Sequence, residues 1–212
     1  MNHVWKSSFF VALIGAGFWR LAEPLHARRK KMDDQPTPQI PSEAIRNTIT
    51  NTGLSIEALS QEAPVLLIFL RHLGCTFCRE TLSDIREKRD YLTRKKIQPV
   101  FVHLSPEEKA APIFEKYSLG DVPRISDPGK ALYHAFGLQR GRILQLLGPR
   151  VWWRGFVVAI LNRHGFGRLM GDGLQMPGVF LIYKGKVLKD FRHRTTGDRP
   201  DYEGMAEYES TH

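Results

Sequence analysis

Six consecutive apolar residues at positions 65–70, Val-Leu-Leu-Ile-Phe-Leu, constrain the fold of this chain more than any other feature. Pro64 precedes the run and Gly74 follows it closely, so turn signals bound it on both sides. An apolar run of this length without polar alternation is typical of a strand that is buried on both faces, as in a parallel sheet. We therefore predict that residues 65–70 form a central strand.

The segments around this strand alternate between helical and extended patterns. The predicted elements are a short helix from Ser42 to about Gly53, a helix over 76–96, a second buried strand over 99–104, a helix from Ser105 to about Ser118, and a hairpin of strands 178–183 and 187–191. A right-handed β-α-β unit followed by a helix and a terminal hairpin is the outline of a thioredoxin-like fold. We therefore predict an α/β protein of this fold, with a central mixed sheet flanked by helices.

A chain of 212 residues suits one domain with an extension or an insertion. We expect residues 1–41 to form an apolar and basic extension with a proline-rich linker, and residues 42–212 to form the thioredoxin-like domain. Residues 139–176, rich in Gly, Arg and bulky apolar side chains, are predicted to be an insertion before the last hairpin. Within it, residues 150–163 fit core packing best, and an interfacial helix, a lid or a dimer contact are the alternatives.

The formal net charge of +9 is concentrated in two segments. Residues 1–31 carry six basic residues against one acidic residue, and residues 139–176 carry six arginines against one aspartate. The rest of the chain is close to neutral. Proteins that bind single-stranded nucleic acid use a continuous basic groove interleaved with aromatic side chains. The charge distribution therefore argues against nucleic acid as a partner.

The amino-terminal apolar run from Ser7 to Trp19 has 13 residues. A transmembrane helix needs about 20 apolar residues, so the run is too short for a comfortable span. Positive charge follows the run more heavily than it precedes it, which favours a cytoplasmic location of the downstream domain. We predict a cytoplasmic protein, in which residues 1–31 are either a loose tail or a weak anchor in peripheral contact with a membrane.

Cys75 and Cys78 are the only cysteines and form a C-x-x-C motif directly after the predicted strand, at the start of a predicted helix. The unpaired amides and the positive dipole end of a helix start stabilise a thiolate, so Cys75 is predicted to be the more acidic thiol. Arg71 and Arg79 add positive charge nearby. Because Cys78 lies one helical turn further on, the two sulfurs can close a disulfide. The alternative to a redox role is that the two cysteines are simply small buried apolar residues.

His72 and His103 raise a different possibility, a metal site. Both imidazoles are expected near the edge of the sheet that carries the cysteines, and zinc binds four nitrogen or sulfur ligands. Structural zinc usually takes its ligands from loops or knuckles, and each histidine has an ordinary role at the end of a strand, so we predict no metal. Arg79, rather than histidine, follows Cys78, which excludes covalent c-type haem attachment. We expect no bound cofactor.

Pro177 stands immediately before the predicted strand at Gly178, where a proline is tolerated at the entry of a strand. In thioredoxin-like folds a cis-proline loop faces the cysteine motif and presents backbone groups to the substrate. We therefore predict a cis peptide bond between Met176 and Pro177, although trans bonds are much more common. Arg71, Thr76 and Pro177 are the residues that we expect to contact the substrate.

Three segments resemble the peroxiredoxin-like 2 group of the AhpC/TSA superfamily. They are Arg71-His72-Leu73-Gly74-Cys75-Thr76-Phe77-Cys78-Arg79-Glu80, Met176-Pro177-Gly178-Val179-Phe180 and Asp198-Arg199-Pro200-Asp201-Tyr202. The similarity covers about residues 42–204, including the Gly-rich insertion. It implies a thioredoxin-like fold and antioxidant activity through the C-x-x-C motif, with Cys75 as the nucleophile and Cys78 as its resolving partner. Some eukaryotic relatives are described as reducing prostaglandin endoperoxides.

The resemblance implies a peroxide-reducing cycle, in which a sulfenic acid on Cys75 is trapped by Cys78 and the disulfide is reduced by thioredoxin or glutathione. Typical peroxiredoxins place a proline seven residues and a threonine or serine three residues before the reactive cysteine. This chain has Ile68 and His72 at those offsets. A general thiol-disulfide oxidoreductase therefore stays an alternative, as does a membrane-associated binding or redox-sensing module.

Overall fold

The computed structural model describes residues 40–141 and 172–208. The predictions for the extension, for residues 150–163 and for most of the insertion therefore lie outside the described residues. What is described contains all of the elements expected around the cysteine motif.

The central strand β1 (Val65–Phe69) lies in a five-stranded mixed sheet of order β3-β2-β1-β4-β5. It pairs in parallel with β2 (Gln98–His103) and antiparallel with β4 (Gly178–Tyr183). The outer strands are β3 (Arg124–Ser126), parallel to β2, and β5 (Lys186–Arg192), antiparallel to β4. All five residues of β1 are buried, as a strand covered on both faces requires. The predictions of the central strand, the second strand and the terminal hairpin are confirmed.

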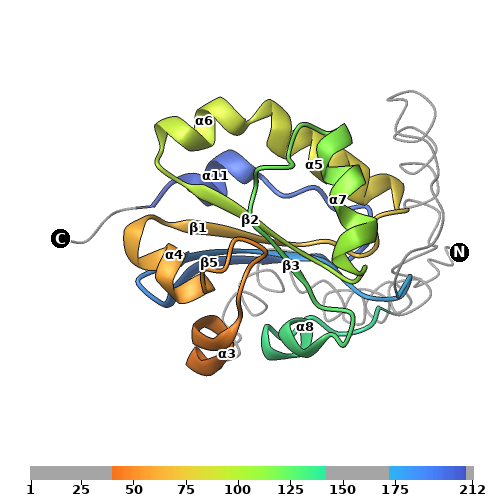
Figure 1. The fold of residues 1–212 in the computed structure, drawn as a ribbon, viewed down its shortest axis with the longest axis horizontal. Coiled ribbons are helices and arrows are strands. Elements are labelled where there is room, and N and C mark those ends of the chain that lie inside the picture. Colours follow the sequence, from red (N-terminus) through yellow and green to blue (C-terminus); the bar gives the residue numbers. More distant parts are fainter. Residues whose placement is uncertain (1–39, 142–171, 209–212) are drawn as a thin grey trace, which may run out of the picture. The chain divides into compact units, whose positions relative to one another are not determined.

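Helices cover both faces of the sheet (Figure 1). They are α3 (Ser42–Asn47), α4 (Ile56–Glu62), α5 (Thr76–Glu87), α6 (Arg89–Arg94), α7 (Glu107–Lys116), α8 (Ala131–Ala135) and α11 (Tyr202–Ala206). Helices α5, α6, α7 and α11 lie on one face, and α3, α4 and α8 lie on the other. Among the described residues, no helix has the length and apolar character that crossing a bilayer requires.

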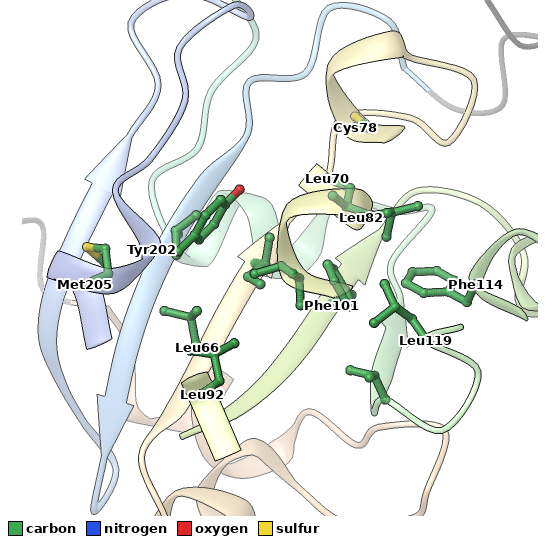
Figure 2. Packing of buried hydrophobic residues seen from close by; sticks show 14 of the residues in the cluster. Leu66, Leu70, Cys78, Leu82, Leu92, Phe101, Phe114, Leu119, Tyr202 and Met205 are labelled. Atoms are coloured by element: carbon green, nitrogen blue, oxygen red, sulfur yellow. The ribbon is translucent and has the colours of Figure 1, made fainter. Parts of the chain in front are cut away.

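The alternation of side chains along β1 divides the core into two clusters. Leu66 and Ile68 pack in the cluster under α5, α6, α7 and α11, together with both cysteines. Leu67 and Phe69 point to the opposite face and pack against α4 and α8. Figure 2 shows the first cluster, with Cys78 at its upper end above Leu70 and Leu82. The cysteine motif is therefore built into the end of a hydrophobic core.

Two helix predictions differ from the structure. The helix that begins at Ser42 ends at Asn47, since the β-branched residues at 48–50 disfavour its continuation. A turn containing Gly53, with φ of +86°, leads instead into α4, where the Ser55 side chain accepts a hydrogen bond from the amide of Ala58. The helix predicted over 76–96 is interrupted at Lys88, where the backbone has φ of −91° and ψ of 5°.

The two ends of the predicted insertion lie side by side. Arg140 and Gln175 form an antiparallel bridge, and the amide of Gly141 donates to the carbonyl of Leu174 at 2.7 Å. The buried Gln175 side chain donates to the carbonyl of Leu138 at 2.8 Å. The two ends of the predicted insertion are therefore held together next to the start of β4.

Candidate active site

The cysteine motif lies where β1 ends and α5 begins. Cys75 is the N-cap residue of α5, and its amide donates to the carbonyl of His72 at 2.9 Å. Its own carbonyl accepts the first helical hydrogen bond, from the amide of Arg79 at 3.0 Å. The strand, tight turn and helix start therefore follow in the order that the sequence predicts, and Cys78 lies on the first turn of α5.

Arg71 contacts both sulfur atoms. Its amide donates to Sγ of Cys78 at 3.3 Å, and its Nη2 donates to Sγ of Cys75 at 3.4 Å. Both cysteines are free and buried, with 6% of Cys75 and 5% of Cys78 exposed. The pair is therefore largely shielded from solvent and lies next to a fixed positive charge.

The two thiols have very different acidities. The pKa of Cys75 is lowered to about 6, chiefly by the hydrogen bond from the Cys78 thiol, against the opposing effect of burial. The charge of Arg71 and the amides of Phe77 and Cys78 add to the lowering. Burial raises the pKa of Cys78, and its role as the donor to Cys75 raises it further. The prediction that Cys75 is the more acidic thiol therefore agrees with the geometry.

His72 contacts Arg71 and is not part of a group of metal-binding side chains within the described residues. Its Nε2 lies 3.3 Å from Nη2 of Arg71, and burial followed by the charge of Arg71 lowers its pKa to about 4. A neutral imidazole accepts the hydrogen bond from the guanidinium and helps to orient it toward Cys75. His103 faces Glu107, with Nε2 3.4 Å from Oε2. Within residues 40–141 and 172–208, no three His, Cys, Asp or Glu side chains cluster closely enough to hold a metal ion.

A small pocket lies beside the cysteines. Its volume is about 20 Å³, which leaves room for roughly one water-sized group. The lining comes from the end of β1, the first turns of α5, the start of β4 and the segment after β5. Of the residues predicted from the sequence, it brings together Arg71, Cys75, Cys78 and Pro177, whereas Thr76 is buried at the start of α5 and does not line the pocket.

The prediction of a cis bond before Pro177 is wrong. No peptide bond within the described residues is cis. The trans form is intrinsically favoured for X-Pro bonds. Pro177 lines the pocket with a trans bond before it. Its carbonyl accepts a hydrogen bond from the amide of His193 at 3.4 Å, which joins the start of β4 to the segment after β5.

The sequence did not predict that the segment after β5 forms a wall of the pocket. The Asp198 carboxylate accepts from the amides of Arg194 at 2.7 Å and Thr195 at 2.9 Å, which closes this segment into a loop. Arg199 forms a two-pronged ion pair with Asp84 of α5, in which Nε lies 2.9 Å from Oδ2. The only available signal was the Asp-Arg-Pro motif itself, since nothing in its spacing places it near the cysteines.

Solved structures of known proteins share this fold. A peroxidoxin, BcpB from Mycobacterium tuberculosis, is 20% identical with a TM-score of 0.50, over 71% of this chain and 82% of that one. Peroxiredoxin Q from Xanthomonas campestris is 14% identical with a TM-score of 0.52, over 73% and 85%. These similarities confirm the prediction of a thioredoxin-like fold with a mixed sheet flanked by helices.

Curated relatives extend the comparison to sequence. A prostamide/prostaglandin F synthase from Salmo salar is 28% identical over 157 residues, covering 71% of this chain and 76% of the relative. Peroxiredoxin-like 2A from Bos taurus is 26% identical over 193 residues, covering 88% and 81%. Residues 38–191, well over half of the chain, match the AhpC/TSA family. The chain therefore belongs to the AhpC/TSA family, and its curated relatives are those of the peroxiredoxin-like 2 group.

Proposed function

We propose that this chain reduces hydroperoxides through a dithiol/disulfide cycle of Cys75 and Cys78. The observation that carries the proposal is the pairing of an acidic Cys75 thiol with a much less acidic Cys78 thiol in the wall of one small pocket. The thiolate is the nucleophilic form of cysteine, and a pKa of about 6 leaves Cys75 mostly ionised at neutral pH. Membership of the AhpC/TSA family supports a thiol redox function.

In the first step the Cys75 thiolate attacks the terminal oxygen of a hydroperoxide, ROOH. The sulfur supplies the electron pair of the new S–O bond, the O–O bond breaks, and RO⁻ leaves and takes up a proton to give ROH. Cys75 is thereby oxidised to a sulfenic acid while the peroxide is reduced. The guanidinium of Arg71, 3.4 Å from Sγ of Cys75, stabilises the thiolate and the departing oxygen anion.

In the second step the Cys78 sulfur attacks the sulfenic sulfur of Cys75. The S–S bond forms, the S–O bond breaks, and the hydroxyl leaves as water with the proton of the Cys78 thiol. The hydrogen bond between the two thiols already brings Cys78 close to its target. A dithiol donor such as thioredoxin, or two molecules of glutathione, then restores both thiols and is itself oxidised.

The size of the pocket restricts which part of a substrate reaches Cys75. A volume of about 20 Å³ admits the terminal oxygen of a hydroperoxide and leaves the organic group at the entrance. Several curated relatives are named prostamide/prostaglandin F synthase. The prostaglandin endoperoxides implied by the sequence resemblance are therefore the second class of oxidant to test.

A general thiol-disulfide oxidoreductase is the alternative function. The same thiolate can attack a disulfide sulfur, so the acidity of Cys75 does not separate the two activities. Its burial favours a peroxide, because with only 6% of Cys75 exposed a protein disulfide has to bring a bulky sulfur to a nearly closed surface. Cytoplasmic location and peripheral membrane contact through residues 1–31 stay predictions.

Mass spectrometry of the reduced full-length chain tests the proposal. One equivalent of hydrogen peroxide or cumene hydroperoxide is expected to remove two hydrogens from the parent, as a Cys75–Cys78 disulfide forms. The Cys78→Ser variant is expected to stop at a sulfenic acid on Cys75, which dimedone traps as a stable adduct. A prostaglandin endoperoxide and oxidised glutathione are run in parallel as competing oxidants.

Two results contradict peroxide reduction. If oxidised glutathione oxidises the parent chain faster than any peroxide does, the chain acts as a disulfide oxidoreductase. If none of the oxidants produces a disulfide or a dimedone adduct, the cysteines do not form a redox pair. Cys75→Ser is the matched control, since it keeps the shape of the pocket and lacks the nucleophile.

A further inference from the structure

Thr196 has a buried hydroxyl in the wall of the cysteine pocket. The residue is only 3% exposed and lines the same pocket as Cys75. Its Oγ1 is buried, and no hydrogen-bond partner for it exists among the described residues. Folded proteins rarely leave a buried hydroxyl without a partner, so such a group inside a pocket points to a partner that enters the pocket.

The neighbouring Thr195 shows that this is not a general property of the loop. The Thr195 hydroxyl donates to Oδ1 of Asp198 at 2.7 Å, and Asp198 also accepts from the amide of Arg194 at 2.7 Å. Arg199 then ties the loop to α5 through Asp84. Thr195 therefore has a structural role. The adjacent Thr196 is held in place by the same loop, but its hydroxyl has no partner among the described residues.

A second unpartnered polar atom lies in the wall of the same pocket. Nε of Arg71 is buried and has no hydrogen-bond partner within the described residues, although Nη2 of the same side chain contacts Cys75 and His72. The residues that line the pocket therefore carry at least two buried, unpartnered polar groups, a guanidinium N–H and a hydroxyl, from segments far apart in the sequence. Two such groups beside one thiolate suit a small ligand with more than one oxygen atom.

We propose that Thr196 is a substrate-binding residue whose hydroxyl hydrogen-bonds the leaving oxygen of a hydroperoxide while Cys75 attacks the other oxygen. This inference rests on the proposed function and adds a residue to it. As the S–O bond forms and the O–O bond breaks, negative charge develops on the leaving oxygen, which finally takes a proton from water. A hydroxyl that donates to this oxygen binds it more tightly in the transition state than in the ground state.

Thr196→Val tests the proposal, because valine keeps the shape of the side chain and removes the hydroxyl. The second-order rate of Cys75 oxidation by hydrogen peroxide is expected to fall about tenfold to hundredfold, whereas alkylation by iodoacetamide changes by less than about twofold. The pH at the midpoint of alkylation is expected to stay at the parent value. Thr196→Ser, which keeps a hydroxyl, is expected to remain within about threefold of the parent in both reactions.

Thermal unfolding separates this role from a structural one. Removing a buried hydroxyl that has no partner in the reduced protein is expected to leave the unfolding midpoint unchanged or to raise it. A hydroxyl that supported the loop would have the opposite effect, and its loss would slow alkylation as well as oxidation. Thr93→Val on α6 is the control for the chemical change, since Thr93 is exposed and, within the described ranges, its hydroxyl bonds only the carbonyl of Arg89.

Three outcomes overturn the proposal, and they differ in what else they overturn. If the parent reacts quickly with hydroperoxide and Thr196→Val matches it, only the role of Thr196 is wrong. If Thr196→Val slows oxidation and alkylation equally and lowers the unfolding midpoint, Thr196 supports the loop and does not bind substrate. If no hydroperoxide oxidises the parent, the proposed function fails together with this inference.

Discussion

The two ends of the sheet carry two very different cavities along the same helix. At the carboxyl end of β1, the cysteine pocket measures about 20 Å³ and adjoins the start of α5. At the opposite end, a cavity of about 380 Å³ lies against the end of α5 and against α6, next to the first residues of β2. Ile85 and Leu92 line this larger cavity, and both belong to the hydrophobic cluster that also contains the cysteines. Figure 2 shows Leu92 in this cluster.

The volume of a cavity therefore does not show where the chemically distinctive groups of this protein lie. Two thiols with shifted pKa values line the small pocket together with Arg71 and Thr196, each of which has a buried, unpartnered polar atom. Among the described residues, none of those lining the large cavity leaves a buried polar side-chain atom without a partner. Two of its three charged residues, Arg89 and Asp121, pair with each other, and the third is Lys96. Shifted acidity and unmet hydrogen bonds therefore mark the reactive end, which is also where open α/β sheets usually bind ligands.

Loss of the Cys75 sulfur is expected to have the largest effect on the rate at which the small pocket consumes peroxide. Cys75→Ser should reduce the rate of peroxide consumption at least about a thousandfold, because the nucleophile is gone. Cys78 does not replace it, since burial keeps its pKa high and its thiol protonated at neutral pH. Stopped-flow measurement of peroxide consumption by reduced protein gives the rate. A variant that keeps the parent rate, while Cys78→Ser loses it, would reverse the two roles.

Arg71→Met is expected to have the next largest effect. The substitution removes the charge 3.4 Å from Sγ of Cys75 and the donor to His72. Because a charge-assisted hydrogen bond to both the thiolate and the leaving oxygen is lost, oxidation by hydrogen peroxide should slow by about tenfold to hundredfold at pH 7. The pKa of the Cys75 thiol should rise in parallel. An unchanged rate would show that the helix start and the Cys78 thiol suffice to activate Cys75.

The pH dependence of thiol reactivity has an expected effect of about tenfold. Cys75 is an acid whose pKa is lowered to about 6, so its reactive thiolate form predominates above that pH and is lost below it. Alkylation by iodoacetamide, followed by mass spectrometry to locate the label, should slow about tenfold between pH 7.5 and pH 5. In Cys78→Ala the midpoint should move upward, because the hydrogen bond from Cys78 is the largest cause of the lowering. A parent midpoint near pH 8.5 would contradict the assigned acidity.

Asp84→Asn is expected to have a smaller effect, on the loop rather than on the thiols. Asp84 is buried and pairs with the half-exposed Arg199, so the pair anchors the loop that carries Thr196. We expect a loss of about 1 kcal/mol in the free energy of unfolding and about a threefold slower oxidation by peroxide. Chemical denaturation and stopped-flow kinetics measure the two effects. Arg199→Gln should give a similar loss, and the double variant should lose less than the sum.

The position of the cysteines between β1 and α5 could be predicted because its sequence signals are local. A continuous apolar run identifies the central strand β1, and a cysteine directly after a strand and before a helix identifies the N-cap position of α5. The relative acidity of Cys75 and Cys78 follows from the same local order. These features require no knowledge of how distant segments pack.

Other parts of the site depend on packing between distant segments. Thr196 lines the pocket because its loop is anchored to α5 by the ion pair between Arg199 and Asp84. The short strand β3 escaped prediction because its three residues include a buried Arg124, whose charge is satisfied by Glu107 at 2.7 Å. The large cavity likewise escaped, since its lining combines the ends of several elements that no sequence pattern links.

Arg89→Met is expected to have the smallest effect and tests the large cavity directly. Arg89 and Asp121 form an exposed ion pair at this cavity, and such pairs contribute at most about 1 kcal/mol to stability. The 12 residues of α5 separate it from Cys75 by roughly 18 Å, at a rise of about 1.5 Å per residue. This exceeds the screening length of about 8 Å at physiological salt, so the lost charge should leave the midpoint of Cys75 alkylation and the rate of oxidation unchanged.

The comparison with Arg71→Met makes this result informative, because both substitutions remove one guanidinium and leave a side chain of similar length. If Arg89→Met slows oxidation as much as Arg71→Met does, charge at the far end of α5 reaches the thiols, and the two cavities are not independent. If only Arg71→Met slows it, the acidity of Cys75 is set by Arg71 and the first turn of α5. Measuring both variants at low and at physiological salt separates long-range electrostatics from packing, since only the former depends on ionic strength.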